Sequence, residues 1–222
     1  MLALLLLASA AANAKYDDYI HAVEAKQTAW NWSEKVRNGR VVVEPANKAG
    51  DIDVGGALIH DWIGSVFIPG TTLDKVLSFL QDYDIHEKYY APEVLKSHLV
   101  SHEGDQWKIS FRLVQNKVVK VVLDVDQTVM YRSVSPTRVY ETGVATRIVE
   151  ASGKDHGYLW RLNTFVRLEE KDGGVYMESR AVSLSRTPPF GLGWLFNPIV
   201  RSLPSESLTR QLTATRKAVL SR

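Results

Sequence analysis

The stretch "GSVFIPGTTLDKVLSFLQDYD", residues 64–84, decides the fold of this chain. It reads as a strand, a tight turn and a helix, in that order. Pro69 cannot donate a hydrogen bond to a β-ladder, so the strand-like run is expected to end there, followed by Gly70 in the turn. Thr71 or Thr72 then offers a hydroxyl as the N-cap of a helix over 72–82. That helix has one apolar face, at i, i+3, i+4 and i+7, formed by Leu73, Val76, Leu77 and Leu80.

Strand-like segments dominate the chain from residue 57 to residue 185. The first covers 57–68, and six more follow the helix, separated by short polar turns that are typical of hairpins. The six later segments cover 94–102, 106–114, 118–131, 138–151, 158–170 and 175–185. Consecutive strands joined by short turns predict an antiparallel meander.

The last segment, 192–220, returns to a helical pattern. One apolar face contains Leu208, Leu212, Thr215 and Val219. Pro204 lies inside this segment, which predicts a kink or two abutting helices. The whole order predicts an α+β helix-grip fold, in which a curved seven-stranded antiparallel sheet wraps on a long C-terminal helix, with an N-terminal helical extension. Space between sheet and helix becomes a ligand cavity where the inward side chains do not fill it.

The N-terminus divides into two parts. Residues 1–14, "MLALLLLASAAANA", combine a short apolar core with a small-x-small end, which predicts a signal peptide cleaved before Lys15, although no positive charge precedes the apolar run. Export to a periplasmic or extracellular location is expected. Residues 15–56 are interpreted as an extension packed on the main domain, 57–222, with a helix over 16–38 that stops at Asn38-Gly39.

Composition excludes several functional classes. The chain has 222 residues, 45% hydrophobic and 23% charged, which is long enough and apolar enough for one buried core. A formal charge of +2 gives no argument for a nucleic-acid partner. The absence of cysteine excludes disulfides and every thiol mechanism.

No catalytic motif stands out in the sequence. A nucleophile elbow, a Walker motif and a dinucleotide fingerprint are all missing, so no catalytic residue and no cofactor is predicted. His98 and His102 have the i, i+4 spacing of a helical metal site, but they fall in a predicted strand, where that spacing separates them by about 13 Å. No metal site is expected.

Two stretches of the chain resemble a known superfamily. "HDWIGSVFIPGTTLDKVLSFLQDYDIHEKYYAPEVLKSHLV", residues 60–100, is similar to the opening of START-like domains of the SRPBCC superfamily, and "YMESRAVSLSR" at 176–186 is similar to the end of their last strand. The resemblance covers roughly residues 57 to 221, and its order of elements is more specific than its individual motifs. It implies a helix-grip fold with an apolar cavity between sheet and C-terminal helix, and relatives that include polyketide cyclases, lipid-transfer domains and coenzyme Q-binding proteins. It does not imply one function.

Polar residues of the late strands and several aromatics are the candidate ligand-binding residues. Alternation places Arg161 and Asn163 on one face, and Glu178 and Arg180 likewise. A charged cluster of this kind recognises a ligand head group if the face lines the cavity. The favoured alternative puts these residues on the convex face in solvent, with Trp160, Leu162 and Met177 turned inward. The aromatics are equally compatible with plain core. The full set of cavity candidates is Tyr89, Tyr90, Arg112, Tyr131, Tyr140, Arg147, Trp160, Arg161, Asn163 and Glu178.

An apolar, basic edge lies near the C-terminus. From residue 186 onward the chain has six basic residues against one acidic residue. This charge, next to an aromatic-rich run, is consistent with contact to an anionic membrane. The favoured alternative is that the aromatics pack under the sheet and the charges form a solvated face. The residues of the cavity entrance or membrane edge are Phe190, Leu192, Trp194 and Phe196.

Three functional hypotheses follow. The leading one is an exported binding protein that holds a hydrophobic small molecule, lipid-like or isoprenoid-like, between sheet and helix. The second is a cyclase or hydratase in which a polar pair, such as Arg147 with Glu178, performs acid–base chemistry in the same cavity. The third is an interaction module, whose signature is a filled cavity and an exposed apolar patch on 16–38.

Overall fold

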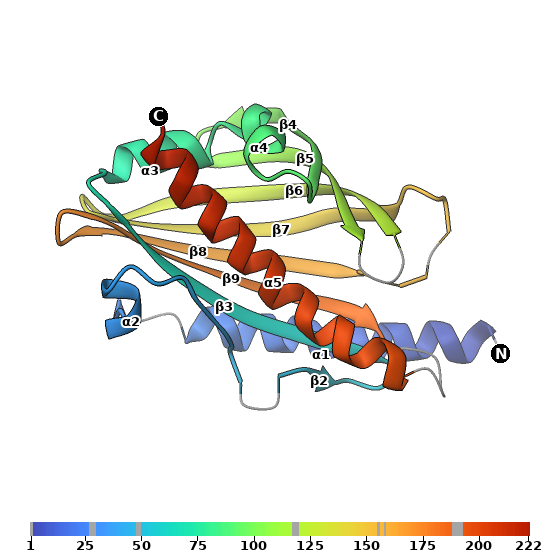
Figure 1. Cartoon of the computed structure of the whole chain (residues 1–222). Coiled ribbons are helices and arrows are strands. Elements are labelled where there is room, and N and C mark those ends of the chain that lie inside the picture. Colours follow the sequence, from blue (N-terminus) through green and yellow to red (C-terminus); the bar gives the residue numbers. More distant parts are fainter. Residues whose placement is uncertain are drawn as a thin grey trace.

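One curved antiparallel sheet forms the body of the protein, with a long helix on each of its faces (Figure 1). This computed structural model describes residues 2–26, 30–47, 50–116, 120–154, 156–157, 159–187 and 193–222; for 2–9 and 193–203 it describes the backbone only. Among the described residues, no helix combines the length and apolar character needed to cross a bilayer.

The sheet confirms the predicted meander. Its seven main strands are β3 (Ala57–Pro69), β4 (Val94–Glu103), β5 (Gln106–Asn116), β6 (Lys120–Ser135), β7 (Arg138–Glu150), β8 (Arg161–Lys171) and β9 (Gly174–Arg186). The order across the sheet is β3-β9-β8-β7-β6-β5-β4, and every neighbouring pair is antiparallel. The first strand therefore pairs with the last, and β4 forms the far edge.

The strand count differs from the seven predicted. Two short strands of the N-terminal extension, β1 (Val42–Pro45) and β2 (Ile52–Asp53), both pair with β3, so the sheet has nine strands. Because β3 is the edge of the predicted sheet, its outer row of backbone groups was available for this pairing.

The opening stretch folds as the sequence predicts. Thr72 is the N-cap of α3 (Leu73–Leu80), and its hydroxyl accepts a hydrogen bond from the Lys75 amide at 3.4 Å. Gly70 adopts a left-handed conformation, with φ of 65°, in the turn between β3 and α3. A short 3₁₀ turn, η1 (Tyr83–Ile85), and one helical turn, α4 (His86–Tyr89), then lead to β4.

The C-terminal helix α5 (Gly193–Leu220) lies across the concave face of the sheet (Figure 1). It is a single helix through Pro204, so the prediction of two abutting helices is wrong. All four residues of its predicted apolar face, Leu208, Leu212, Thr215 and Val219, are buried. Gly64 of β3 lies directly beneath Leu208 and Leu212, which allows close approach of helix and strand.

The N-terminal extension covers the opposite, outer face. The predicted single helix over 16–38 is wrong: α1 (Leu2–Ala25) and α2 (Glu34–Arg37) are separate, and residues 30–33 between them are not helical. Trp32 in that linker stacks on Tyr176, with ring centroids 5.0 Å apart, and donates to Glu169 at 2.5 Å. These contacts attach the linker to the sheet and end the helical run.

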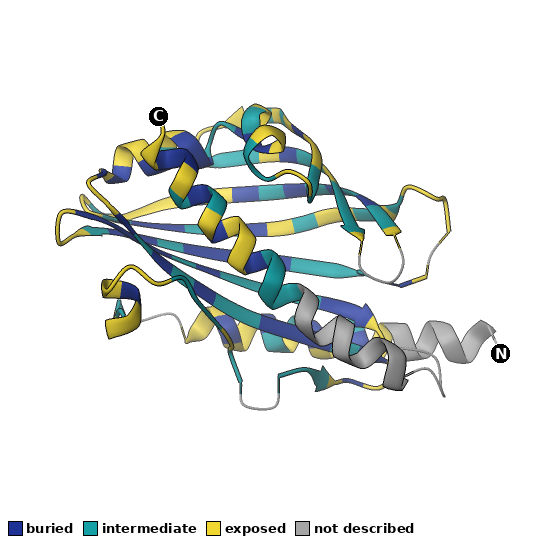
Figure 2. Ribbon diagram, viewed as in Figure 1, coloured by how far each residue is buried: buried dark blue, intermediate teal, exposed yellow. Residues whose placement is uncertain are grey.

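Two separate clusters of buried apolar side chains result. Alternation along the strands sends one set of residues toward α5 and α3 and the other toward α1. Burial classes change from residue to residue along several strands in Figure 2. The outer cluster contains Tyr16, Ile20 and Val23 of α1, packed against Ile59 and Leu184 of the sheet. Because these α1 residues are buried, the patch expected of an interaction module on 16–38 is not found among the described residues.

Candidate functional site

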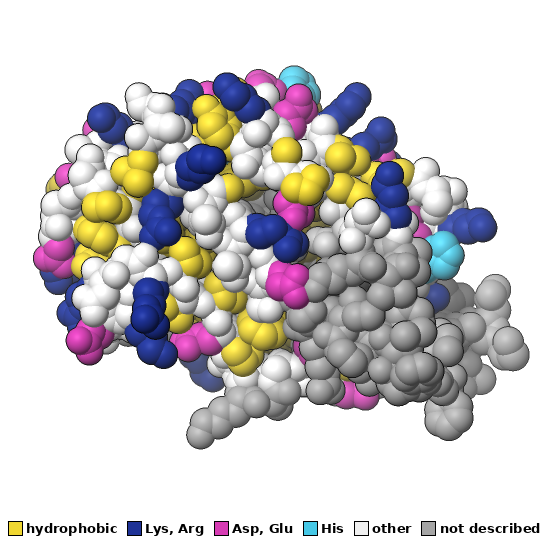
Figure 3. All heavy atoms as spheres, in the orientation of Figure 1, with side chains coloured by type: hydrophobic (Ala, Val, Ile, Leu, Met, Phe, Trp, Pro, Cys, Tyr) yellow, Lys and Arg dark blue, Asp and Glu magenta, His cyan; other side chains and the backbone are white. Residues whose placement is uncertain are grey.

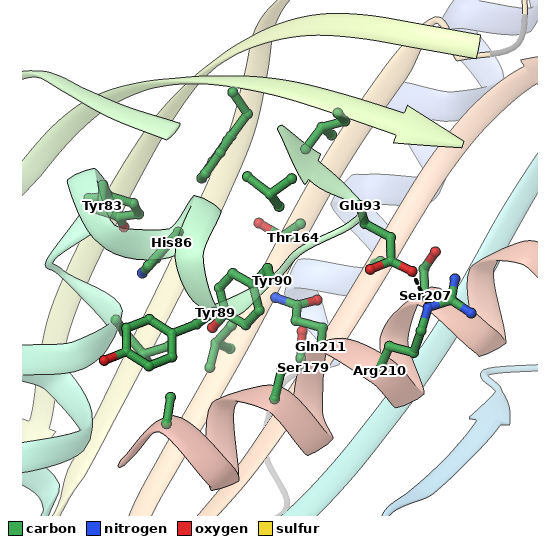
Figure 4. Close-up of a pocket in the computed structure, with 18 of the residues that line it drawn as sticks. Tyr83, His86, Tyr89, Tyr90, Glu93, Thr164, Ser179, Ser207, Arg210 and Gln211 are labelled. Atoms are coloured by element: carbon green, nitrogen blue, oxygen red, sulfur yellow. Dashed lines mark ion pairs between the residues drawn. The ribbon is translucent and has the colours of Figure 1, made fainter. Parts of the chain in front are cut away.

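A cavity of about 820 Å³ lies between α5 and the concave face of the sheet. Its wall is mainly apolar, with side chains from the middle strands and the α3–α4 region (Figure 4). This volume is within the usual range for pockets that hold a drug-sized ligand. Apolar wall residues on the strands include Ile109, Phe111, Val125, Val129, Val166 and Met177.

Small side chains explain why the cavity is not filled. On the sheet side, the wall contains Thr164 of β8 and Ser179 and Ala181 of β9 at adjacent positions. On the helix side, Ala214 and Ala218 of α5 face the same space. Larger aliphatic residues at these positions would interdigitate and close the gap, as in an ordinary core.

The two faces of α5 have different roles. Leu208, Leu212 and Val219 pack into the core at the β3 side. The adjacent face, which lines the cavity, contains Ser207, Gln211, Ala214, Ala218 and Ser221 at i, i+4, i+7, i+11 and i+14. The helix is therefore fixed along one side and presents small or polar residues along the other.

The cavity opens between α5 and the segment from α4 to β4. Exposed lining residues from both sides, Lys88, Gln211 and Lys217, mark this opening. Glu93, before β4, forms an ion pair with Arg210 of α5 across it (Figure 4). Gln115 of β5 donates to the Ser207 hydroxyl at 3.1 Å, so a second polar contact joins the strands to the helix.

The face around this opening is mixed in character. In Figure 3, basic, acidic and hydrophobic side chains are interspersed over the described part of this face, without one continuous apolar area. Among the described side chains, Lys88 and Lys217 have no carboxylate partner, although both line the cavity. The opening therefore has excess positive charge beside the paired Glu93 and Arg210.

A polar cluster lies deeper in the cavity, formed by Glu141 of β7, Tyr131 of β6 and Tyr83 of η1. Glu141 is directly opposite Tyr131 and Val166 in the sheet register, and all three line the cavity. The Tyr83 and Tyr131 hydroxyl oxygens are 2.7 Å apart, and Tyr131 hydrogen-bonds Glu141. Since a phenol has one hydrogen, a Tyr131 that donates to the ionised carboxylate must accept from Tyr83.

Burial dominates the electrostatics of this cluster. It raises the pKa of Glu141 to about 7, and the hydrogen bond from Tyr131 only partly offsets that effect. Burial also raises the pKa of Tyr83 and Tyr131 far above the ordinary tyrosine value, so both remain protonated donors. Nearby, burial lowers the pKa of His86 to about 4, which keeps this imidazole neutral.

Three of the predicted ligand-binding residues lie in the cavity wall: Tyr89, Tyr90 and Tyr131. The Tyr90 hydroxyl is 2.8 Å from that of Thr215 on α5, so Tyr90 also links α4 to the helix. Phe79 of α3 packs edge-on against both Tyr89 and Tyr90. The ligand-binding role of all three tyrosines remains a prediction.

The other seven candidates are not among the residues that line the cavity, so the cavity placement is wrong for them; for Arg161, Asn163 and Glu178 the outer face is the alternative that the sequence favoured. Strand register puts the six that lie in strands on the outer face, because their cavity-facing neighbours alternate with them. Trp160 precedes β8 and is placed by its packing. Arg112 and Arg147 are exposed and pair with Asp124 and Asp126. Trp160, which was expected to turn inward, packs with the outer cluster under Arg186. The seven are Arg112, Tyr140, Arg147, Trp160, Arg161, Asn163 and Glu178.

Helix α1 explains the polar residues of the late strands. Arg161 donates to Asp17 at 2.7 Å, and Tyr16 donates to Asn163 at 3.0 Å, so both strand residues bind α1. Glu178 pairs with Arg167 at 2.5 Å on the same face, far in the register from Arg147. The Arg147–Glu178 acid–base pair considered from the sequence therefore does not form.

The residues predicted to form a cavity entrance or membrane edge have no described side chains. Phe190 and Leu192 lie outside the described residues, while Trp194 and Phe196 lie in α5 where only the backbone is described. Conversely, sequence reasoning missed Glu141. Its only local signal was alternation in "VYETGV", which places Glu141 in phase with Val139 and Gly143 and opposite to Tyr140.

Known structures share this architecture at low sequence identity. No family model matches the sequence, and no curated protein matches it. A STAR-related lipid transfer protein from Xanthomonas axonopodis superposes with a TM-score of 0.55 at 16% identity, over 77% of this chain and 98% of that one. Human STARD10 superposes with a TM-score of 0.53 at 8% identity, over 88% of this chain and 82% of that one. The Zhui aromatase/cyclase from Streptomyces sp. R1128 superposes with a TM-score of 0.50 at 11% identity, over 73% of this chain and 92% of that one. Together with the sheet closed by α5, these similarities show that the chain has the START-like, helix-grip fold.

Proposed function

We propose that this protein binds a hydrophobic small molecule, lipid-like or isoprenoid-like, and carries or presents it. The observation that carries this proposal is the cavity of about 820 Å³ with an apolar wall, small residues on facing elements, and an opening beside α5. Burial of an apolar ligand there would contribute about 25 cal/mol for each Å² of apolar surface removed from water. The lipid transfer protein among the similar structures supports the same class of ligand.

Native mass spectrometry with lipid extraction of the purified protein tests this proposal. We expect a hydrophobic molecule to co-purify, or an added one to bind in a single stoichiometric step. Ala181→Phe should reduce occupancy, because it places a ring in the cavity from β9. Val144→Phe adds the same ring at an exposed position, 40% accessible, and should leave occupancy unchanged. Absence of any ligand, together with equal behaviour of both variants, would refute the proposal.

A second candidate function is a cyclase or hydratase, and Glu141 is the observation that favours it. A carboxyl group with a pKa of about 7 can both give and take a proton near neutral pH. Its Tyr131 and Tyr83 partners would orient it toward a substrate in the cavity. In this reading Glu141 replaces the Arg147–Glu178 pair.

The enzyme hypothesis is tested on the molecule that co-purifies. That molecule is extracted, added back to protein stripped of ligand, and followed by mass spectrometry for loss or gain of water or for isomerisation. An enzyme should give a product that Glu141→Gln no longer forms, while Glu141→Gln still binds the molecule. Recovery of the unchanged molecule after prolonged incubation would contradict catalysis and leave the binding function intact.

We also propose export with cleavage before Lys15. Cleavage there removes Asn13, which contacts Arg161, but retains Tyr16 and Asp17, which form the principal contacts of α1 with β8. N-terminal sequencing of the protein, expressed with residues 1–14 in a host with a general secretory pathway, tests this. Lys15 should be the first residue in the exported fraction; an intact Met1 confined to the cytosol would argue against export.

Ligand exchange at an anionic membrane is the finer part of the proposal. It rests on the basic C-terminal segment and on the sequence pattern at Phe190, Leu192, Trp194 and Phe196. The purified protein should sediment with phosphatidylglycerol-containing vesicles at low salt, and not with purely zwitterionic ones. Equal recovery in the supernatant for both vesicle types would remove the membrane from this account.

A further inference from the structure

The carboxylate of Glu141 has no positive partner among the side chains that the structure describes. No Lys, Arg or His among the described side chains forms an ion pair with it, and its one hydrogen bond comes from Tyr131. Elsewhere in this protein, carboxylates in buried positions are paired: Asp61 with Arg180, and Glu169 with Arg138. Charges taken out of water are normally kept only where they are both paired and hydrogen-bonded, whereas Glu141 has the hydrogen bond without an ion pair among the described side chains.

The geometry of the cluster leaves acceptor capacity turned to the cavity. A carboxylate has two oxygens and about four acceptor positions, of which Tyr131 uses one. Tyr131 itself is engaged on both sides, by Glu141 and by the Tyr83 hydroxyl at 2.7 Å. Glu141 is partly accessible although β6 and β8 flank it, because its open side faces the cavity. An occupant of the cavity would therefore meet an unshared acceptor.

We propose that Glu141, positioned by Tyr131 and Tyr83, binds a hydrogen-bond-donating head group, a hydroxyl or an amine, at the inner end of an otherwise hydrophobic ligand. This inference rests on the proposed binding function and specifies the ligand class. A carboxylate head group would be repelled by Glu141, and a group without a donor would leave the acceptor unpaired. The opening is different in charge, since Lys88, Arg210 and Lys217 lie there.

Isothermal titration with ligands of equal length tests the assignment. Full-length protein is stripped of ligand and titrated at pH 8 with decylamine, decanol, decyl methyl ether and decanoic acid. Decylamine and decanol should bind at least about 10-fold more tightly than the ether and the acid, because a hydrogen bond to a buried charged group is worth about 1.5–3 kcal/mol. A preference for decylamine over decanol identifies a cation site, a preference for decanol identifies a hydroxyl site, and equal affinities mean that the carboxylate accepts from either donor.

Two variants connect the preference to the cluster. Glu141→Gln should abolish the selectivity and retain binding, and Tyr131→Phe should weaken it without changing a charge. Glu178→Gln is the matched control, since it makes the same substitution on the outer face of the sheet and should keep the selectivity. Urea unfolding of each variant verifies that it is folded.

The outcomes separate this inference from the proposed function. If all four ligands bind equally to the native protein, or if decanoic acid binds most tightly, the head-group assignment is wrong and the binding function stands. The assignment is also wrong if Glu141→Gln keeps the native selectivity. If none of the four binds and no molecule co-purifies, both the binding function and the assignment are overturned.

Discussion

Glu141 shows how a single residue acquires properties from its surroundings. On an exposed strand it would be an ordinary carboxylate, but in the cavity wall burial raises its pKa to about 7. The ordinary value is 4.5, so between these values the folded protein holds a proton that the unfolded chain has lost. The free energy of unfolding must therefore fall as pH rises through this window.

Glu141→Gln should remove this pH dependence. Relative to the native protein, the variant is expected to gain stability between pH 4.5 and pH 8, by up to about 3 kcal/mol for a shift of this size. His86 acts in the opposite direction, because its lowered pKa makes stability fall as pH drops from 6.5 toward 4. Both proteins contain His86, so its contribution cancels in the difference between their urea unfolding curves at each pH. A difference that does not vary with pH would contradict the assigned pKa.

At the scale of elements, the two long helices are attached to the sheet by different means. Helix α5 approaches β3 closely because Gly64 has no side chain: a Cβ there would lie 2.6 Å from Leu212 Cδ1 and 2.8 Å from Leu208 Cγ. Helix α1 uses apolar contacts together with the Tyr16 hydroxyl, whose single hydrogen is shared between the Val182 carbonyl at 2.8 Å and Asn163 Oδ1 at 3.0 Å. The first attachment sets the depth of the cavity; the second covers the outer face.

Gly64→Ala should displace α5. The added methyl group overpacks the contact, and the unfolding free energy should fall by roughly 1–3 kcal/mol despite the lower entropy of the unfolded chain. Chemical denaturation measures this loss. In a double-mutant cycle with Leu212→Ala, which removes the nearest clashing atom and leaves Leu208 in place, the two substitutions together should cost less than the sum of their separate effects. Strict additivity would mean that Gly64 and Leu212 are not in contact.

Tyr16→Ala should release α1 from the sheet. The side chain is fully buried, so its loss is expected to cost about 3–5 kcal/mol, in the range of large aromatic truncations. Tyr16→Phe, which keeps the ring, should cost about 1 kcal/mol for the lost hydrogen bonds. Asp18→Ala on the exposed side of α1 is the control and should have little effect. A Tyr16→Ala variant as stable as the control would show that α1 contributes nothing to the fold.

At the scale of the whole molecule, the cavity is an open space between the sheet and α5. The sheet and α5 are held together at the β3 side by core packing and at the β5 side by polar contacts. Separation of α5 from the strands at the side of the Glu93–Arg210 ion pair changes few buried contacts, because the Arg210 side chain is 45% exposed and that of Glu93 24%. Ligand exchange is therefore expected beside α5 and not through the core.

Removal of the Glu93–Arg210 ion pair should accelerate exchange. Arg210→Ala and Glu93→Ala are each expected to increase the dissociation rate of a bound fluorescent ligand several-fold in stopped-flow experiments. Since both side chains are partly exposed, stability should change by less than about 1 kcal/mol. Arg112→Ala, which breaks an exposed pair on the outer face, should leave the dissociation rate unaltered. Identical rates in all three variants would place the exit route elsewhere.

Local sequence patterns were sufficient to predict most of the helices and strands. The turn at Pro69-Gly70, the Thr72 cap, the short hairpin turns and the apolar face of α5 each depend on neighbours within a few residues. Their order alone predicts the meander and the helix that crosses it. The prediction of one helix over 16–38 was wrong because the segment 30–33 packs on distant strands instead of continuing the helix, as Trp32 does with Glu169, 137 positions later in the chain.

The composition of the cavity required the folded molecule. Alternation separates a strand into two sets of side chains, but it does not say which set faces the ligand when helices cover both faces. Here α1 covers the outer face and binds Arg161 and Asn163, so polar residues that resembled a ligand site are structural. Glu141 became a site residue only because β6, β7 and η1 bring Tyr131 and Tyr83 beside it. Sequence periodicity therefore predicts the container, whereas long-range packing selects the residues that face its contents.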